Sequence, residues 1–190
     1  MRGFLQFYTM TRKLANEELN RKSIEEFHEA DKIPVVIVLD DIRSMNNVGS
    51  VFRTADAFLV ERIILGGITP RPPHREIQKT ALGATESVLW THEADLVAAV
   101  TKLKSDGIKV VAVEQVKDSV SLETFQPTAN EKWALVFGNE VFGVSQEVVD
   151  LADYCIEIPQ LGTKHSLNIS VSAGIVMWEA FRKLHKNIQA

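Results

Sequence analysis

The chain has 190 residues, of which 45% are hydrophobic and 24% charged, and its formal net charge is −4 at pH 7. This composition is that of an ordinary globular protein, and the length suits one domain better than two. The acidic balance argues against indiscriminate nucleic-acid binding. Because there is a single cysteine, Cys155, no intramolecular disulfide can form, which fits a reducing compartment. With no convincing signal peptide and no apolar run of the ~20 residues that a bilayer requires, we expect a cytoplasmic protein with no membrane partner.

The first element predicted along the chain is a polar helix over residues 11–31, with apolar positions at Leu14, Leu19, Ile24 and Phe27. We predict that residues 1–32 form an N-terminal helical extension and that residues 33–190 form the main domain. Continuous apolar runs, typical of strands buried on both faces of a parallel sheet, cover residues 35–39, 62–66, 109–113, 133–137 and 155–158. Helical patterns lie between and after them, at residues 48–58, 94–105, 146–151 and 167–186. This alternation predicts an α/β fold with a mostly parallel sheet flanked by helices.

Ligands of such sheets bind outside the carboxyl ends of the strands, so the segments after the apolar runs are the candidate sites. The first contains Asn47, Gly49 and Arg53. Asn47 is suited to cap a helix that begins near Val48. Gly49 lies one turn before Arg53 on the same helix face and would leave its guanidinium open to a ligand. A surface arginine with an incidental glycine is the plainer interpretation.

The second segment follows the run at residues 133–137. Gly138 and Gly143 bracket Glu140 in a predicted strand-to-helix turn, where glycine permits a positive φ or a close backbone approach. The segment lacks the spacing of a phosphate loop or of a dinucleotide fingerprint. A carboxylate there disfavours a phosphate, so a neutral or cationic ligand fits better. A plain turn after the strand is the alternative.

The third segment, residues 158–175, places Ser166, Asn168, Ser170 and Ser172 at the start of an otherwise apolar helix. Ser166 could serve as its N-cap. Capping would not then account for Asn168, which falls inside the first predicted turn. The small residues nearby indicate a helix packed closely against another element.

Other kinds of catalytic site find little support. Cys155 lies within a predicted strand, where a cysteine is usually a small core residue. The histidines lack metal-ligand spacing and no Cys-x-x-Cys occurs, so no metal is expected. A Gly-x-Ser-x-Gly nucleophile elbow is also absent from the sequence.

Taken together, the three segments resemble the signature motifs of the SpoU (TrmH-like) RNA 2′-O-ribose methyltransferases of the SPOUT superfamily. The matching motifs are Asn47-x-Gly49-x-x-x-Arg53, Gly138-Asn139-Glu140-x-x-Gly143, and Ile158-Pro159-x-x-Gly162 leading into Ser166-Leu167-Asn168-Ile169-Ser170. The resemblance spans roughly residues 35–184. It implies a C-terminal deep trefoil knot, S-adenosyl-L-methionine as methyl donor, S-adenosyl-L-homocysteine as product, and a homodimer.

The resemblance also implies roles for individual residues. Arg53 of one subunit would reach the methyl donor held by the other and help the ribose hydroxyl lose its proton. Because a guanidinium is a poor base, we expect Arg53 mainly to orient the ribose and stabilise the developing oxyanion, with deprotonation late in the step. Asn47, Glu140, Ser166 and Asn168 complete the expected catalytic set. The expected methyl-donor site comprises Val113, Glu114, Gly138, Asn139, Glu140, Gly143, Ile158, Gln160, Leu161, Ser166 and Leu167.

The substrate expected is tRNA, with ribosomal RNA as the alternative. Two basic clusters, represented by Arg12 and Lys13 and by Arg71, Arg75 and Lys79, are candidates for RNA contact. From charge alone, either cluster could be a solvated face. A methyltransferase-like domain that binds RNA without catalysis is a second possibility, which the full set of motif residues disfavours. A nucleotide-binding α/β domain of other chemistry is a third, disfavoured because no phosphate loop is present.

Overall fold

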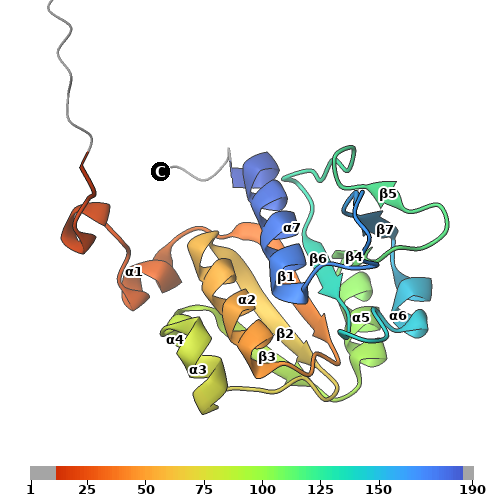
Figure 1. Ribbon diagram of the computed structural model, residues 1–190, viewed down its shortest axis with the longest axis horizontal. Helices are drawn as coiled ribbons and strands as arrows, with labels where there is room; N and C mark the ends of the chain where they lie inside the picture. The colour runs from red at the N-terminus through yellow and green to blue at the C-terminus, as the bar shows by residue number, and fades with distance from the viewer. Residues whose placement is uncertain (1–11, 186–190) are drawn as a thin grey trace, which may run out of the picture.

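The computed structural model describes residues 12–185, which form a seven-stranded sheet covered by helices (Figure 1). The strand order is β3-β2-β1-β6-β4-β7-β5 and every neighbouring pair is parallel. The strands are β1 (Ile33–Asp40), β2 (Val60–Gly66), β3 (Leu89–Glu93), β4 (Lys109–Val113), β5 (Val120–Ser121), β6 (Trp133–Phe137) and β7 (Tyr154–Glu157). The helices are η1 (Asn16–Leu19, a 3₁₀ turn), α1 (Ile24–Glu29), α2 (Met45–Ala57), α3 (Arg75–Ala81), α4 (Ala84–Ser87), α5 (Leu96–Ser105), α6 (Gln146–Leu151) and α7 (Ile169–Leu184).

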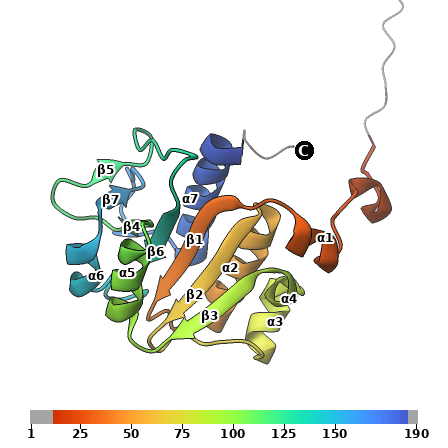
Figure 2. The same cartoon turned by 180° about the vertical axis from the view of Figure 1, so that it is seen from behind.

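The central strand β1 divides the core into two layers because successive side chains point to opposite faces of the sheet. Ile37 and Leu39 belong to the cluster that includes residues of α2, α3 and α7. Val36 and Val38 belong to the second cluster, with residues of α5 and α6. Figure 2 shows α5 and α6 on one side of the sheet and α2 and α7 on the other. A strand buried on both faces must be continuously apolar, as the run at residues 35–39 is.

The predicted mostly parallel α/β fold is confirmed, and each of the five predicted strands and the four predicted helices after residue 33 matches a structural element with small shifts at its ends. Strands β3 and β5 and helices α3 and α4 were not predicted. Strand β3 carries Thr91, His92 and Glu93 at the edge of the sheet, so it lacks an apolar run. Strand β5 has two residues and α4 has four, too few for a periodic pattern.

The single helix predicted over residues 11–31 is wrong. Asn20, in the left-handed region at φ 47°, ends the 3₁₀ turn. A separate short helix, α1, then begins after Ser23, whose Oγ accepts from the Glu26 N–H at 3.2 Å. Of the predicted apolar positions only Phe27 is buried, whereas Leu14 is 58% exposed, so no long helix gains a packing face. Residues 1–11 of the predicted extension and residues 186–190 lie outside the described residues, and the division into extension and domain stays a prediction.

No helix within residues 12–185 is long and apolar enough to cross a membrane.

Candidate functional site

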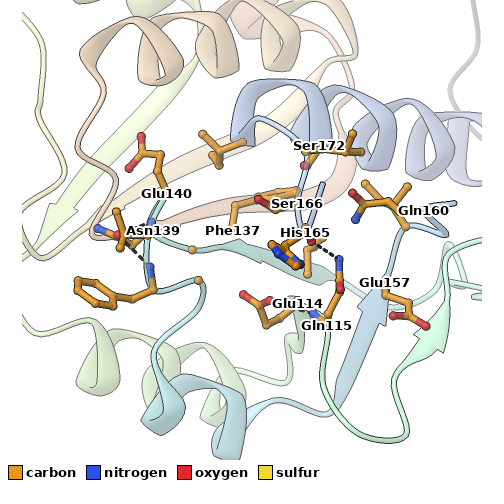
Figure 3. Close-up of a pocket in the computed structure, with 18 of the residues that line it drawn as sticks. Glu114, Gln115, Phe137, Asn139, Glu140, Glu157, Gln160, His165, Ser166 and Ser172 are labelled. Carbon is orange, nitrogen blue, oxygen red and sulfur yellow. Dashed lines mark hydrogen bonds between the residues drawn. The ribbon is translucent and has the colours of Figure 1, made fainter. Parts of the chain in front are cut away.

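Three loops meet at the carboxyl edge of the sheet and enclose a cavity of about 310 Å³ (Figure 3). They follow the adjacent strands β6, β4 and β7 and comprise residues 138–145, 114–119 and 158–168. Because these strands are parallel neighbours, their carboxyl ends lie side by side and bring the loops together. The second and third predicted segments therefore converge on one site.

The predicted methyl-donor residues lie around this cavity, with one exception. Those that line it are Val113, Glu114, Gly138, Asn139, Glu140, Gly143, Ile158, Gln160, Ser166 and Leu167. Leu161 does not line the cavity, and its side chain is fully exposed at 103%. The structure thus brings together residues from three separate parts of the chain.

Further lining residues were missed by the sequence reasoning. They are Gln115, Phe137, Val141, Phe142, Ile156, Glu157, His165, Ile169 and Ser172. Most are direct chain neighbours of predicted residues, and that adjacency was the signal that could have identified them. Gln115 has a specific role because its Nε2 donates to the backbone oxygen of His165 at 3.0 Å, which ties the loop after β4 to the loop after β7.

The loop after β6 requires its two glycines. Gly143 has φ 72°, and a Cβ placed there would lie 2.1 Å from Oε2 of Glu114. A Cβ on Gly138 would lie 2.0 Å from the backbone nitrogen of Val144. The Glu114 carboxylate fills this space and accepts from the N–H of Val144 at 2.9 Å and from that of Gln115 at 2.9 Å. Glycine therefore allows the loops after β4 and β6 to approach closely.

Asn47 joins the three predicted motifs, although not as the helix cap that was expected. Helix α2 begins at Met45 and is capped by Ser44, so Asn47 lies within its first turn. Its side chain is thereby free to donate from Nδ2 to Oε1 of Glu140 at 3.1 Å. Its Oδ1 accepts from Nδ2 of Asn168 at 3.3 Å. The Glu140–Asn47–Asn168 chain links the loop after β6 to the start of α2 and the start of α7.

Glu140 also binds the backbone that leads into α2. Its carboxylate accepts from the N–H of Arg43 at 3.0 Å and from the N–H of Ser44 at 3.1 Å. Burial by itself raises the pKa of Glu140, but these backbone donors together with the Asn47 amide lower that pKa on balance. Glu140 is therefore held as a carboxylate that fixes the loop, with its acceptor oxygens already occupied.

The predicted cap of the last helix is also corrected. Helix α7 begins at Ile169 and its N-cap is Asn168, whose Oδ1 accepts from the Ser170 N–H at 2.9 Å and from the Ser170 hydroxyl at 2.7 Å. Capping thus does account for Asn168, while Ser166 lies outside the helix and lines the cavity. The helix starts two residues later than the sequence pattern indicated.

Gly49 has a different role from the one predicted. A Cβ there would lie 2.1 Å from Oγ1 of Thr80 and 2.3 Å from the backbone oxygen of Ile77. Glycine is thus required for the close packing of α2 against α3, and does not serve to uncover Arg53. Arg53 is exposed and does not line the first cavity; it lines a second cavity of about 800 Å³, together with Arg21 and Lys22.

The charges around the first cavity indicate what it can hold. Three carboxylates, those of Glu114, Glu140 and Glu157, belong to its wall, and none of the lining residues is a lysine or an arginine. A phosphate would be repelled there, whereas a neutral or positively charged ligand is favoured. Across residues 12–185, no group of three or more His, Cys, Asp or Glu side chains is placed to hold a metal ion.

The residues predicted to contact RNA are exposed and lie in separate segments. Arg12 pairs with Glu18 in the segment before α1, at 2.5 Å, and Lys13 is nearby in the chain. Arg71 precedes α3, whereas Arg75 and Lys79 lie on it, and Lys79 is 3.9 Å from Glu76. They do not form one cluster with the cavity at the sheet edge.

A parallel α/β sheet with a loop-built cavity at its carboxyl edge is typical of a domain that binds a small ligand. Comparison with known proteins shows to which family this domain belongs. The sequence profile of the SpoU rRNA Methylase family matches residues 34–178, so the chain belongs to this family. A Staphylococcus aureus protein assigned to the TrmH family of tRNA/rRNA methyltransferases is 34% identical over 159 residues, covering 83% of this chain and 62% of that protein. The chain thus spans less than two thirds of that relative.

Solved structures agree in fold. The S-adenosylmethionine-bound rRNA methyltransferase of Sinorhizobium meliloti superposes with a TM-score of 0.73 at 28% identity, over 80% of this chain and 57% of the other. A structure described as giving insight into the 2-OH methylation of C/U34 on tRNA superposes with a TM-score of 0.68 at 27% identity, over 78% of this chain and 95% of the other.

Proposed function

We propose that this protein transfers a methyl group from S-adenosylmethionine to a ribose 2′-hydroxyl of tRNA and releases S-adenosylhomocysteine. One observation carries the proposal. Of three sequence-distant motifs that resemble those of the 2′-O-ribose methyltransferases, the second and third meet around one cavity, and Asn47 of the first is hydrogen-bonded to Glu140 of the second and Asn168 of the third. A similar fold over nearly the whole of a structure concerned with 2-OH methylation of tRNA supports the same reaction.

The cavity fits the methyl donor in size and charge. Its volume of about 310 Å³ lies at the lower end of small-molecule sites, which run from about 300 to 1,000 Å³. A wall that contains carboxylates and lacks lysine and arginine complements a sulfonium. The donor would be held by Val113, Gly138, Ile158, Gln160 and Leu167 together with the other lining residues predicted from the motifs. When bound, it supplies an electrophilic methyl carbon.

The residues of the chain position the reactants. We assign Arg53 the orientation of the ribose and the stabilisation of charge on its 2′-oxygen, because a guanidinium remains protonated at any ordinary pH. Ser166 would position the ribose, and Asn47, Glu140 and Asn168 would fix the loops. Arg53 lies on the second cavity and not on the first, which supports a site whose two halves come from two chains.

A homodimer would complete the site. On α7, Val171, Ile175 and Trp178 are 49%, 37% and 51% exposed. Their spacing places them on one face of the helix, where an apolar stripe is expected to be covered. We propose that this stripe packs against a second copy of the chain. We further propose that the segment at residues 158–168 passes through the loop after β4 as part of a trefoil knot, which the Gln115–His165 contact supports.

The RNA would bind on the side of the second cavity. Arg21, Lys22 and Arg53 line it and can contact successive phosphates, with Arg12 and Lys13 in the preceding segment and Arg71, Arg75 and Lys79 at α3. Ribosomal RNA is the second candidate substrate, favoured by the likeness to the Sinorhizobium meliloti rRNA methyltransferase. We also propose a cytoplasmic location, in keeping with the single cysteine.

A subunit-mixing assay tests the reaction and the shared site. The Arg53→Ala and Ser166→Ala variants are each expected to be inactive on tRNA, measured by mass spectrometry of its nucleosides. Because a mixed dimer keeps one intact site of two, equal mixing should restore roughly a quarter of wild-type activity. Absence of recovery would contradict the shared site. Binding of S-adenosylmethionine without any transfer to tRNA or rRNA would instead favour a non-catalytic RNA-binding protein.

A further inference from the structure

The loop after β6 carries an exposed aromatic side chain at the first cavity. Phe142 is 86% exposed and belongs to the wall of that cavity. The other phenylalanines within residues 12–185 are buried or half-buried. Val141, its neighbour in the chain, is 64% exposed. An apolar side chain that is left in water forgoes the free energy of burial, so two of them together at a cavity indicate a binding surface.

The backbone that carries this ring is held by several hydrogen bonds. The side-chain oxygen of Asn139 accepts from the N–H of Val141 at 2.8 Å and from that of Phe142 at 3.2 Å (Figure 3). The backbones of Asn139 and Gly143 exchange two hydrogen bonds of 2.9 Å. Asn139 also donates from Nδ2 to the backbone oxygen of Asp41 at 2.7 Å. The ring thus stands on a pre-formed support, which lowers the entropy lost when a ligand binds.

An exposed arginine is fixed to the same loop. Arg43 lies between β1 and α2, and its N–H donates to Oε2 of Glu140 at 3.0 Å. Its side chain is exposed and does not line the cavity, and its guanidinium has no hydrogen-bond or ion-pair partner among residues 12–185. A guanidinium without a protein partner is suited to bind a phosphate. Through Glu140, the structure therefore joins a segment with an aromatic ring to a segment with an available cation.

The charges of the cavity decide which part of an RNA can meet Phe142. Glu114, Glu140 and Glu157 belong to the wall and no lysine or arginine does, so a phosphate is repelled there. The proposed reaction requires the ribose 2′-oxygen to lie close to the methyl carbon, so the base joined to that ribose must lie at the mouth of the cavity. A base is uncharged and its flat face can stack on an aromatic ring. The phosphate is then expected outside the cavity, on the side of Arg43.

We propose that the base of the methylated nucleotide stacks on the ring of Phe142 and that Arg43 binds a phosphate of the same nucleotide. The inference rests on the proposed function and adds two substrate-binding residues that the motif resemblance did not indicate. Because every base has a π-face, stacking on Phe142 holds the base without selecting its identity. The base must leave its neighbours in the RNA to reach the ring, which costs least for an unpaired nucleotide in a loop.

Phe142→Leu and Phe142→Tyr separate stacking from simple apolar contact, since leucine lacks the ring that tyrosine keeps. Transfer is measured on whichever of tRNA and rRNA the wild type methylates. We expect Phe142→Leu to lower kcat/KM by roughly tenfold to a hundredfold, the usual effect of losing one stacked base, and Phe142→Tyr to stay within about twofold of wild type. Leu89→Ala, at a position on β3 that is 64% exposed, is the control and should keep the wild-type kcat/KM.

Arg43→Gln tests the phosphate contact through the salt dependence of RNA binding. The logarithm of the affinity falls linearly with the logarithm of the salt concentration, and each phosphate contact contributes roughly 0.7–0.9 to the slope. Arg43→Gln should weaken RNA binding and reduce the slope by about that amount, in filter-binding titrations at several KCl concentrations with S-adenosylhomocysteine present. Lys102→Gln is the matched control, because its side chain is 75% exposed on α5, on the other side of the sheet from α2.

Two measurements without turnover distinguish this role from other uses of the ring. Calorimetry should show S-adenosylhomocysteine binding to Phe142→Leu as tightly as to wild type, and light scattering should show an unchanged mass. A loss of S-adenosylhomocysteine affinity as large as the loss of kcat/KM would make Phe142 part of the donor site, and a changed mass would make it a contact between subunits. Either result would overturn base stacking, as would a wild-type kcat/KM for Phe142→Leu. An unchanged salt slope for Arg43→Gln would overturn the phosphate contact, whereas a wild-type protein that transfers no methyl group to RNA would overturn the proposed function.

Discussion

At the scale of single residues, Glu140 shows how one carboxylate can connect several segments of a site. It accepts from two backbone N–H groups before α2 and from the side chain of Asn47. Each donor stabilises the charged form, so the stabilisation depends on ionisation. The contribution is complete above the ordinary pKa of 4.5 and is lost as the pH falls through the lower pKa of the folded state.

Glu140→Gln should therefore lower the melting temperature at neutral pH. The glutamine amide has one NH₂ group in place of an acceptor oxygen, and this group would face the N–H donors that bind the carboxylate in the wild type. The difference in melting temperature from wild type should narrow as the pH falls below 4.5, where the carboxylate of the unfolded chain becomes protonated, and further as the pH falls through the lower pKa of the folded state. Thermal melts at a series of pH values measure this. Glu123→Gln, at an exposed position, is the control and should follow wild type throughout. A difference in melting temperature that stays constant with pH would show that the charge of Glu140 does not contribute to stability.

A second prediction at the scale of single residues concerns the packing of Gly49 against α3. Gly49→Ala places a Cβ 2.3 Å from the backbone oxygen of Ile77, so α2 and α3 must separate. We expect a loss of about 1–3 kcal/mol in the free energy of unfolding, the usual effect of overpacking. Denaturant titration provides the measurement. Ser50→Ala, one position further on the same helix, should change the free energy by less than about 0.5 kcal/mol. Equal stability of the two variants would contradict the close helix contact.

At the scale of elements, the Gln115–His165 contact is the link between two loops of the cavity. Gln115→Glu preserves the size of the side chain but replaces the donor by a carboxylate that faces a carbonyl oxygen. Losing the bond and adding repulsion should weaken S-adenosylhomocysteine binding roughly tenfold, or about 1.4 kcal/mol. Calorimetry measures this. Gln146→Glu, on α6 and away from the cavity lining, should bind as wild type does.

The elements that the sequence predicted are those with a strong periodic or apolar pattern. The run at residues 35–39 identifies β1 because a strand buried on both faces has no polar positions. Strand β3 was not predicted because an edge strand is half solvated and mixes polar with apolar residues. The N-terminal helix was overpredicted because weak apolar spacing carries no information about whether a packing partner exists.

The site was predictable as a set of segments but not as a set of contacts. Spacing identified Asn47, Glu140 and Asn168, yet not that Asn47 lies between the other two. That arrangement depends on the exact start of α2 and α7, and helix starts are the least certain part of any pattern. Gln115 was missed because its role comes from a partner 50 positions away.

At the scale of the whole molecule, the exposed stripe on α7 predicts self-association. Ile175→Asp places a charge in the middle of the stripe, so the proposed dimer should dissociate into folded monomers. Light scattering coupled to size exclusion measures the mass, and circular dichroism checks the fold. Val97→Asp, at an exposed apolar position on α5, is the control and should leave the mass unchanged. A wild-type protein that is already monomeric would contradict the proposed interface.

The bond between Asn47 and Asn168 joins residues 121 positions apart, and this separation has a consequence for protein synthesis. A chain still emerging from the ribosome can contain strands β1 to β6 without the loop after β7 or the cap of α7. Such a chain has the parts of the cavity wall that follow β4 and β6 but lacks the parts supplied by β7, the loop after it and α7. The proposed methyl-donor binding would then begin only after α7 has left the ribosome and packed against α2, and a partly made chain would lack the proposed activity.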